Sequence, residues 1–237
     1  MEQTAHAGQT ARARARAQLT GEIKEEARRQ LAAEGAQRLS VRAVARELGM
    51  VSSALYRYFP SRDDLLTALI IDAYNALGES AEQAAEQAPP GDFRGRWHAC
   101  AAAARAWALA HPHEYALIYG SPVPGYQAPA ETIDPAGRVA RVLGTLLADA
   151  WQASEATLPV PPPLPGLLAA QAETIGGLIA PGVPGPVVAR AIIAWTQLFG
   201  MISFELFGQF VGSTDPADDF FGYAVEQQAD LIGLPRP

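Results

Sequence analysis

The segment from residue 39 to residue 66 reads LSVRAVARELGMVSSALYRYFPSRDDLL and contains two short helical patterns. Ser40 is a residue type that caps helix N-termini, and the apolar positions within residues 41–48 share one helical face. Gly49 supplies a tight turn, and a second short helix is predicted over residues 52–58. Two short helices joined by a glycine-containing turn are typical of a helix-turn-helix, in which the second helix enters the major groove of DNA.

The predicted second helix has an outer surface that suits DNA. Leu55 and Phe59 lie four residues apart and face inward, whereas its other residues are small, aromatic or basic. Such side chains approach base edges and phosphates without burying an unpaired carboxylate. Arg42 and Arg62 flank this helix, and we expect both to contact phosphate. The candidate DNA-binding residues are Ser40, Arg42, Ser52, Ser53, Ala54, Tyr56, Arg57, Tyr58 and Arg62.

Charge is distributed unevenly along the chain. The 237 residues carry a net charge of −7, yet residues 1–66 hold 11 Arg or Lys against 8 Asp or Glu, whereas residues 67–237 hold 7 against 17. A basic unit is therefore joined to an acidic one, which favours a polyanionic partner for the first part only. On the pattern alone the alternative stays open that this is a structural helical hairpin whose arginines form a solvated face.

The remaining patterned regions are helical as well. Hydrophobic residues make up 49% of the chain, enough for a sizeable core, and no alternating strand pattern with hairpin turns occurs. We therefore predict an all-α protein of about ten helices. Besides the two above, the expected helices cover Leu19–Glu34, residues 62–87, Phe93–Ala110, Glu114–Tyr119, residues 134–154, Leu167–Ile179, Pro186–Phe210 and Ala217–Ile232.

Four parts follow one another along the predicted chain. Residues 1–16 have little apolar content and are expected to form a flexible basic tail. Residues 17–66 form a three-helix, helix-turn-helix domain, and a linking helix covers residues 61–88, beginning with a capping-box-like Ser-x-x-Asp pattern. Proline and glycine at positions 89–91 mark the change to a larger helical domain, residues 89–237.

Composition and motifs exclude several classes of protein. Cys100 is the single cysteine, so neither an intrachain disulfide nor a multi-cysteine metal site is possible. The N-terminus lacks the apolar segment of a secretory signal, and uncharged stretches such as Ala191–Phe204 are expected to be too short or too interrupted to cross a bilayer. Phosphate-binding glycine loops and common hydrolase motifs are absent. We expect a cytoplasmic protein that is not an enzyme, with no catalytic residue, cofactor or metal site.

The helix-turn-helix segment resembles the tetracycline-repressor (TetR) family of bacterial transcriptional regulators. The resemblance covers residues 17–69 and rests on three motifs: Ser40-Val41-Arg42-x-Val44-Ala45-x-x-Leu48-Gly49, Leu55-Tyr56-x-Tyr58-Phe59 and Ser61-x-x-Asp64-Leu65-Leu66. It implies an N-terminal DNA-binding domain joined by a linking helix to a larger ligand-binding and dimerisation domain. It also implies that Tyr56 and Tyr58 contact phosphate or base edges and that Arg62 contacts phosphate.

The C-terminal half is similar to the TetR C-terminal type named for a Trp-His-Gly motif. The similarity rests on Ala106-Trp107-x-x-x-His111-Pro112-x-x-Tyr115-x-x-x-Tyr119-Gly120-Ser121 and on Trp195-Thr196-Gln197-Leu198-Phe199-Gly200. Phe199 stands where that motif has its histidine, so no role of that histidine is carried over. Aromatic-lined cavities suit small ligands, although aromatic residues also simply fill cores. The candidate ligand-binding residues are Trp97, Trp107, Tyr115, Tyr119, Trp195 and Phe199.

The last two predicted helices are expected to form a dimer interface. The helix Pro186–Phe210 has an apolar arc wider than one core face needs, and a two-fold packing of four helices would cover the excess. The alternative is a helix buried wholly within its own subunit. The candidate interface residues are Ile192, Ile202, Leu206, Phe210 and Phe221.

These observations together favour a ligand-responsive transcriptional regulator. We expect a repressor that binds a palindromic operator as a homodimer and is released by a small apolar or aromatic effector. Its expected partners are double-stranded DNA, a second copy of the chain and an unidentified small molecule, with no membrane. Two alternatives are a helical interaction or adaptor protein without DNA binding, and a helical-bundle enzyme.

Overall fold

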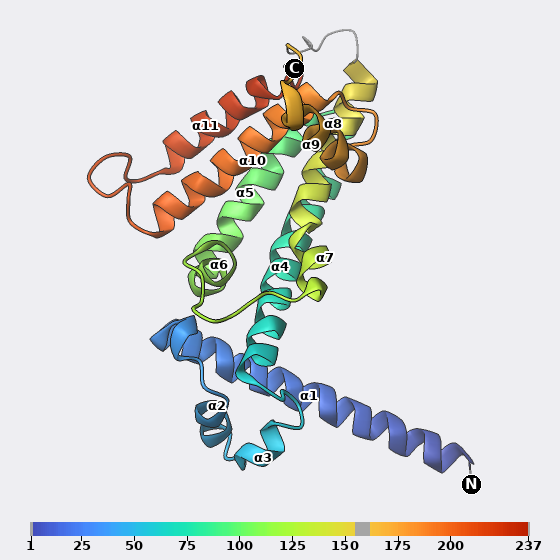
Figure 1. The fold of residues 1–237 in the computed structure, drawn as a ribbon, viewed down its shortest axis with the longest axis vertical. Helices are drawn as coiled ribbons and strands as arrows, with labels where there is room; N and C mark the ends of the chain where they lie inside the picture. The colour runs from blue at the N-terminus through green and yellow to red at the C-terminus, as the bar shows by residue number, and fades with distance from the viewer. Residues whose placement is uncertain (1, 155–161, 237) are drawn as a thin grey trace. The chain divides into compact units, whose positions relative to one another are not determined.

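The computed structural model describes residues 2–154 and 162–236 (Figure 1). Over these residues the chain forms α-helices and two short 3₁₀ turns, η1 and η2, and no strand is present within them. The expectation of an all-α protein is confirmed. The described chain forms two compact units, one made of residues up to Ala73 together with His113–Thr132, the other of Tyr74–Pro112 together with the residues from Ile133 onward.

The first unit is built around the helix-turn-helix. Its helices and turns are α1 (Glu2–Glu34), η1 (Ala36–Arg38), α2 (Val41–Glu47), α3 (Ser52–Leu55), the first part of α4 (Arg62–Gln87), nearly all of α6 (Pro112–Tyr119) and η2 (Ala130–Thr132). Both η1 and α2 pack against α1, and α2 packs against α3. The buried apolar face of α1, with Ile23, Ala27 and Leu31, has the four-residue spacing predicted from the sequence.

Helix α1 includes the N-terminal segment that is expected to form a flexible basic tail. Helix α1 begins at Glu2 and continues without a break through residues 12–16 to Glu34. The physical reason is composition, because alanine, arginine and glutamine are strong helix formers and no proline interrupts them. The arginines at positions 12, 14 and 16 are exposed on this helical extension.

Helix α6 and the loop after it belong to the first unit, although they follow residue 89 in the sequence. Arg28 of α1 pairs with Glu114 of α6 at 3.1 Å and with Asp72 of α4 at 2.8 Å. The hydroxyl groups of Thr67 and Tyr126 are hydrogen-bonded at 2.9 Å. These polar contacts tie residues 113–132 to α1 and to the first half of α4.

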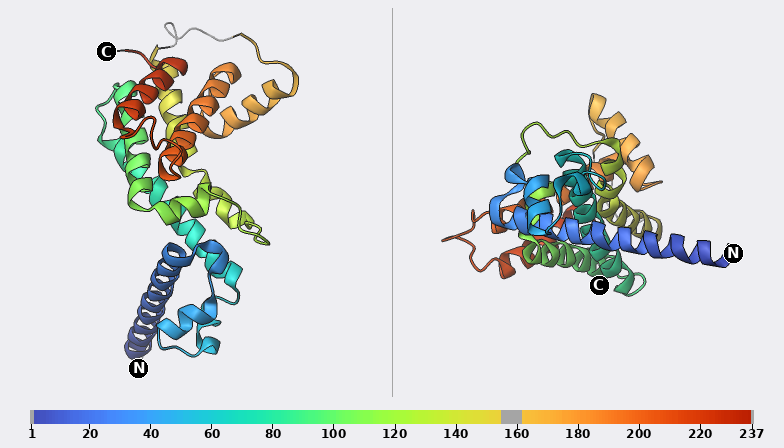
Figure 2. Two further views of the ribbon diagram at one scale, coloured as in Figure 1. Left: turned by 90° about the vertical axis from the view of Figure 1, so that its left-hand side faces the viewer. Right: turned by 90° about the horizontal axis from the view of Figure 1, so that it is seen from below.

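The second unit is a helical bundle. It contains the second half of α4, α5 (Phe93–Ala110), α7 (Ile133–Ala136), α8 (Arg138–Ser154), α9 (Gly166–Ile179), α10 (Gly185–Leu206) and α11 (Asp218–Leu231). Helix α5 packs against α8, α10 and α11, and α10 packs against α9 and α11. Figure 2 gives two further views of these neighbouring helices. The single helix expected over residues 134–154 is divided into α7 and α8 at Gly137.

Two glycines allow close helix contacts in the second unit. A Cβ atom at Gly78 of α4 would lie 2.6 Å from Cβ of Arg138 in α8, and one at Gly144 of α8 would lie 2.3 Å from the carbonyl oxygen of Ile179 in α9. At Gly78, Arg138 donates both to the carboxylate of Glu82 and to the side-chain and backbone oxygens of Asn75, the last two at 3.0 Å. Helix α8 is thereby attached to α4.

Helix α10 ends four residues before the expected end at Phe210, and it is apolar over most of its length. Its 22 residues are sufficient in length and composition to span a membrane, whereas the stretch within it was expected to be too short. Val187, Val188, Ala194, Leu198 and Ile202 are instead buried inside the unit. In all, 33% of the apolar window of α10 is buried inside the unit.

Candidate functional site

The helix-turn-helix is fixed on α1 by its buried residues. Ser40 caps α2 as predicted, since its hydroxyl oxygen accepts a hydrogen bond from the Ala43 amide at 3.4 Å. Val44 and Leu55 are fully buried. The inward side of α2 and α3 is therefore anchored, and their outer side is held in a fixed orientation.

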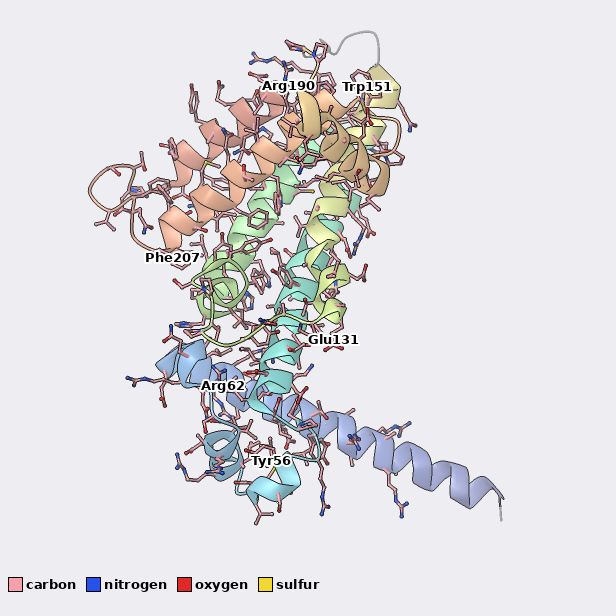
Figure 3. All side chains as sticks on the ribbon, in the orientation of Figure 1. Tyr56, Arg62, Glu131, Trp151, Arg190 and Phe207 are labelled. Atoms are coloured by element: carbon pink, nitrogen blue, oxygen red, sulfur yellow. The ribbon has the colours of Figure 1, made fainter. Side chains whose placement is uncertain are left out.

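Helix α3 and the turn directly after it, residues 52–58, carry most of the predicted DNA-binding residues. Regular α-helix ends at Leu55, and the chain continues through tight turns in which the Tyr58 amide donates to Leu55 O at 2.8 Å. Tyr56 lies on this part of the chain, as Figure 3 shows. The exposed candidates are Arg42, Ser53, Tyr56 and Arg57, and the partly buried ones are Ser40, Ser52, Ala54 and Tyr58.

Two residues on this surface were not among the predicted ones. Val51, which precedes α3, is 70% exposed and offers an apolar contact of the kind that a thymine methyl group accepts. Arg16 of α1 places its guanidinium 5.3 Å from the centre of the Tyr58 ring, a cation–π contact. The arginines near the N-terminus were noticed in the sequence, but only the helical extension of α1 brings one of them to Tyr58.

The guanidinium of Arg62 is bonded to backbone carbonyl oxygens and to Asp63. Its Nη2 donates to Ala36 O at 2.8 Å, its Nε donates to Leu39 O at 3.1 Å, and Nη1 pairs with Asp63 at 3.2 Å. The connection between α1 and α2 leaves carbonyl oxygens that need donors, and Arg62 supplies them. Arg62 thus clamps the connection between α1 and α2, and its phosphate contact stays a prediction.

An apolar pocket lies within the second unit, with a cavity volume of about 180 Å³. Of the six aromatic candidates for ligand binding, Trp97 of α5 and Trp195 of α10 line it. Helices α8, α9 and α10 supply aliphatic and small residues to its wall, among them Leu143, Gly144, Leu147, Ile175, Val188 and Ile192. None of the residues that line the pocket is charged.

The other four aromatic candidates lie outside this wall. Trp107 stacks on the His111 ring, with centroids 5.2 Å apart, and Phe199 is buried with its ring 5.8 Å from that of Trp195. Tyr115 is fully buried in the first unit, and its ring lies 5.2 Å from that of Tyr119. Trp107, Tyr115 and Phe199 are buried, Tyr119 is partly buried, and ligand contact by these four residues stays a prediction.

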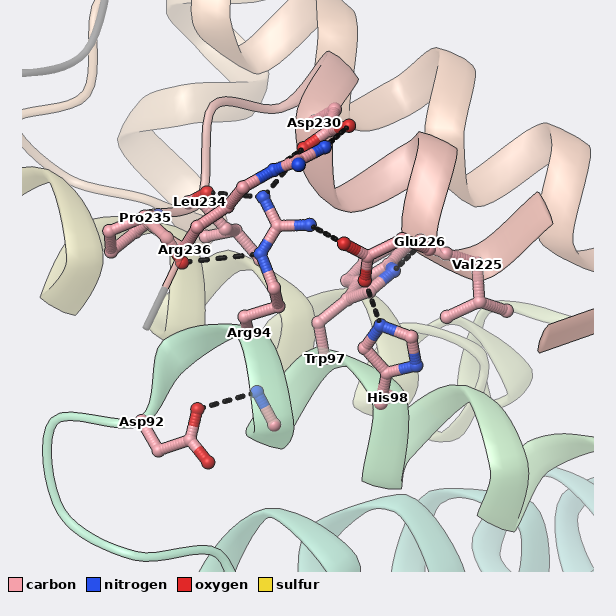
Figure 4. Close-up of polar contacts among 11 residues, drawn as sticks. Asp92, Arg94, Trp97, His98, Val225, Glu226, Asp230, Leu234, Pro235 and Arg236 are labelled. Carbon is pink, nitrogen blue, oxygen red and sulfur yellow. Dashed lines mark hydrogen bonds and ion pairs between the residues drawn. The ribbon is translucent and has the colours of Figure 1, made fainter. Parts of the chain in front are cut away.

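A polar cluster behind Trp97 joins α5 to α11 and to the C-terminal segment (Figure 4). The buried Arg94 donates to Glu226 at 2.6 Å, to Asp230 at 2.7 Å and to the carbonyl oxygen of Leu234 at 2.7 Å. The indole N–H of Trp97 donates to Val225 O at 3.2 Å. These bonds fix the orientation of one of the two tryptophans in the pocket wall.

The pKa values of the carboxylates in this cluster follow from their partners. Hydrogen bonds from Arg236 and Arg94 lower the pKa of Asp230 to about 2. The hydrogen bond with His98, together with the charge of Arg94, lowers the pKa of Glu226. Both carboxylates are therefore ionised at neutral pH and balance the buried Arg94. Sequence inspection did not identify Arg94, because its partners lie more than 130 residues away.

Comparison with known proteins identifies the family. Residues 23–69 match the family model described as "Bacterial regulatory proteins, tetR family", and residues 97–228 match the one described as "Tetracyclin repressor-like, C-terminal domain". The chain belongs to the TetR family. The match to the TetR N-terminal model contains α2, α3 and the start of α4. The match to the TetR C-terminal model contains the pocket helices α8, α9 and α10.

TetR relatives support this assignment over most of the chain. An HTH-type transcriptional regulator of Mycobacterium tuberculosis, Rv1816, is 42% identical over 209 residues, which cover 85% of this chain and 87% of the relative. The crystal structure of the regulatory protein SCO4313 has a TM-score of 0.76 and 35% identity, covering 92% of this chain and 98% of that one. A Rhodococcus sp. RHA1 protein of unknown function, 24% identical with a TM-score of 0.68, shares the fold over 92% of this chain and 96% of that one. The chain is thus a DNA-binding transcriptional regulator of the TetR family.

The expected dimer residues of this TetR-family chain are distributed over different environments. Ile202 and Phe221 are buried within their own protomer, and their part in a dimer contact stays a prediction. Ile192 lines the pocket, while Leu206 and Phe210 are partly exposed. The exposed apolar residues on or beside α10 and α11 are instead Ile193, Phe204, Phe207, Val211, Phe220 and Tyr223.

Cys100 and the side chains able to bind a metal are two further groups of interest in the described part of the chain. Burial raises the pKa of the Cys100 thiol to about 11, as expected of a small buried residue rather than a reactive one. Among residues 2–154 and 162–236, no group of three or more His, Cys, Asp or Glu side chains is placed to hold a metal ion.

Proposed function

We propose that this TetR-family regulator is a cytoplasmic repressor that binds a palindromic operator as a homodimer and is released by a small apolar effector. The observation that carries the DNA-binding part is the outer surface of α3. Small, aromatic and basic side chains gather on residues 52–58, which include no carboxylate, and the inner side of this segment is buried. Such a surface can lie in a major groove.

Dimerisation is supported by the apolar surface of α10 and α11. Phe204 and Phe207 are 52% and 44% exposed, and Tyr223 on α11 is 65% exposed. Exposed aromatic residues that gather on neighbouring helices mark an interaction surface rather than a chance distribution. A second copy presenting the same surface would cover these residues by a two-fold arrangement.

Effector release is supported by the attachment of the pocket to α4. Helix α8 supplies Leu143, Gly144 and Leu147 to the pocket, and its Arg138 is bonded to Glu82 and Asn75 of α4. Helix α4 begins in the first unit and ends in the second. We infer that a ligand that displaces α8 shifts α4 and changes the spacing of the two recognition helices, which must be ~34–36 Å to read successive major grooves. DNA affinity falls because the ligand favours the other spacing.

Fluorescence anisotropy against the DNA that flanks the protein's own gene tests this proposal, with a random duplex as control and two salt concentrations. We expect tight, sequence-selective binding that weakens as salt rises, because phosphate contacts release counterions. Absence of binding to either duplex at low salt would contradict the repressor and favour an adaptor protein.

A further inference from the structure

We propose that the effector of this regulator is an uncharged, largely apolar molecule of one or two rings that carries a hydrogen-bond acceptor for the indole N–H of Trp195. This inference deepens the proposed function, because it assigns a ligand class to the pocket among α5, α8, α9 and α10. It depends on three properties of the pocket: a single unpartnered donor, the absence of charge in its wall, and its size.

The unpartnered donor is Nε1 of Trp195. This atom is buried and has no hydrogen-bond partner among the residues that the structure describes, although Trp195 lies in the pocket wall. The indole nitrogen of Trp97, the other tryptophan in the wall, already donates to Val225 O at 3.2 Å. A buried donor without a partner is costly, and an indole N–H can only donate. A molecule that satisfies Trp195 must therefore present an acceptor, such as a carbonyl or ether oxygen, and the indole must turn its N–H toward it, because Nε1 is buried in the empty pocket.

Water is a poor occupant of this site. A buried water molecule needs two to four polar partners, and apart from the two indoles the side chains that line the pocket are aliphatic or absent, as at Gly144. An organic acceptor group that is attached to an apolar body gains the Trp195 hydrogen bond and buries its remaining surface against Leu143, Leu147 and Val188.

The pocket wall also excludes a charged ligand. None of the lining residues is charged. Arg94, three residues before Trp97 on α5, already donates to Glu226, Asp230 and two backbone carbonyl oxygens. A carboxylate in the pocket would receive one hydrogen bond and no balancing cation. Burying such an anion is far less favourable than burying a neutral acceptor.

The volume sets the size of the ligand. The cavity of about 180 Å³ is slightly larger than an apolar cavity of about 150 Å³ that accommodates benzene. One ring with a short substituent fits this space, and two fused rings approach its limit. Long acyl chains exceed it.

Three probes of similar shape separate these properties: acetophenone has a neutral acceptor, ethylbenzene has none, and benzoate has a charged one. Titrations of the DNA-free protein, followed by the indole ¹H–¹⁵N resonances, give both affinity and the atom involved. We expect acetophenone to bind about tenfold tighter than ethylbenzene, and benzoate to bind weakest. We also expect the Trp195 indole proton to move downfield with acetophenone alone.

Trp195→Phe removes the donor and keeps an aromatic ring, and Trp107→Phe is the matched control outside the pocket. We expect Trp195→Phe to reduce the preference for acetophenone over ethylbenzene to about twofold or less, and Trp107→Phe to retain it. Ala191→Leu, which extends a lining side chain into the cavity, should weaken acetophenone and ethylbenzene alike. Thermal unfolding of each variant shows that it is folded.

Several results would overturn the inference: equal binding of the three probes, tightest binding of benzoate, no binding of acetophenone, or a preference that survives Trp195→Phe. Because these titrations contain no DNA, they are independent of the repressor proposal. Acetophenone that binds through Trp195 without releasing operator DNA contradicts effector release and leaves the ligand class standing. If benzoate releases the operator and the Trp195 indole proton does not respond, effector release stands and the proposed ligand class is contradicted.

Discussion

At the scale of single residues, Arg62 and Arg42 show how two arginines near α3 differ in role. Arg62 donates to carbonyl oxygens of Ala36 and Leu39, whereas Arg42 is exposed on α2. We expect Arg62→Ala to lower the free energy of unfolding by about 1 kcal/mol, because part-buried hydrogen bonds to Ala36 O and Leu39 O are lost. Chemical denaturation monitored by circular dichroism measures this change.

Arg42→Ala is the matched control for Arg62→Ala. We expect it to leave unfolding almost unchanged and to reduce the slope of log affinity for DNA against log salt concentration by about one unit. If Arg62→Ala instead keeps full stability and changes only the salt dependence, Arg62 is a phosphate contact after all.

Asp230 makes stability depend on pH in the acidic range. Its pKa is about 2 in the folded protein against an ordinary value of 3.8, because Arg236 and Arg94 donate to it. Because folding lowers this pKa, ionised Asp230 stabilises the fold at pH values above the unfolded pKa. This contribution to stability is lost as the pH falls from about 4 to 2. We expect Asp230→Asn to flatten the decline in melting temperature over this range. Asp219→Asn, on the exposed first turn of the same helix α11, should keep the decline.

At the scale of helices, the contact of α8 with α9 depends on the absence of a side chain at Gly144. A Cβ atom there would lie 2.3 Å from Ile179 O, which is backbone and cannot move aside without shifting α9. We therefore expect Gly144→Ala to lower the melting temperature. It should also alter acetophenone binding, because Gly144 and Ile179 both line the pocket.

Gly177 in the interior of α9 is the control, since a Cβ atom there meets nothing within 4 Å. Gly177→Ala should stabilise the protein by roughly 0.5–1 kcal/mol, the usual gain from replacing glycine in a helix. Differential scanning calorimetry compares the two variants, and equal effects would show that the Gly144 contact is not restrictive.

The helices were more predictable from sequence than the roles of side chains. The Ser40 cap, the buried Leu55 and the four-residue spacing in α1 are local features, and each was recognised. The partners of Arg62 are backbone carbonyl oxygens, which carry no residue identity, so its clamp could not be inferred. The assignment of Trp97 and Trp195 to the pocket, with Trp107 outside it, depends on how α5, α8 and α10 pack, which periodicity does not specify.

At the scale of the whole molecule, the exposed residues of α10 and α11 carry the proposed self-association. We expect Phe207→Asp to convert a dimer into a monomer at micromolar concentration, because it places a charge in an apolar contact. Leu178→Asp on α9 is the control, since Leu178 is 76% exposed and lies away from these helices in sequence. Analytical ultracentrifugation measures the mass, and dimers in both variants would place the interface elsewhere.

The folded chain is expected to be unreactive toward thiol reagents, because its single cysteine, Cys100, is buried. Its thiol is buried and its pKa is raised to about 11, so little thiolate exists at neutral pH for a maleimide or methanethiosulfonate to attack. A cysteine introduced at the exposed Ser53 would then be the single labelling site in each protomer. Pulsed electron spin resonance between two such labels would report the separation of the recognition helices directly, with and without acetophenone, on otherwise unmodified protein.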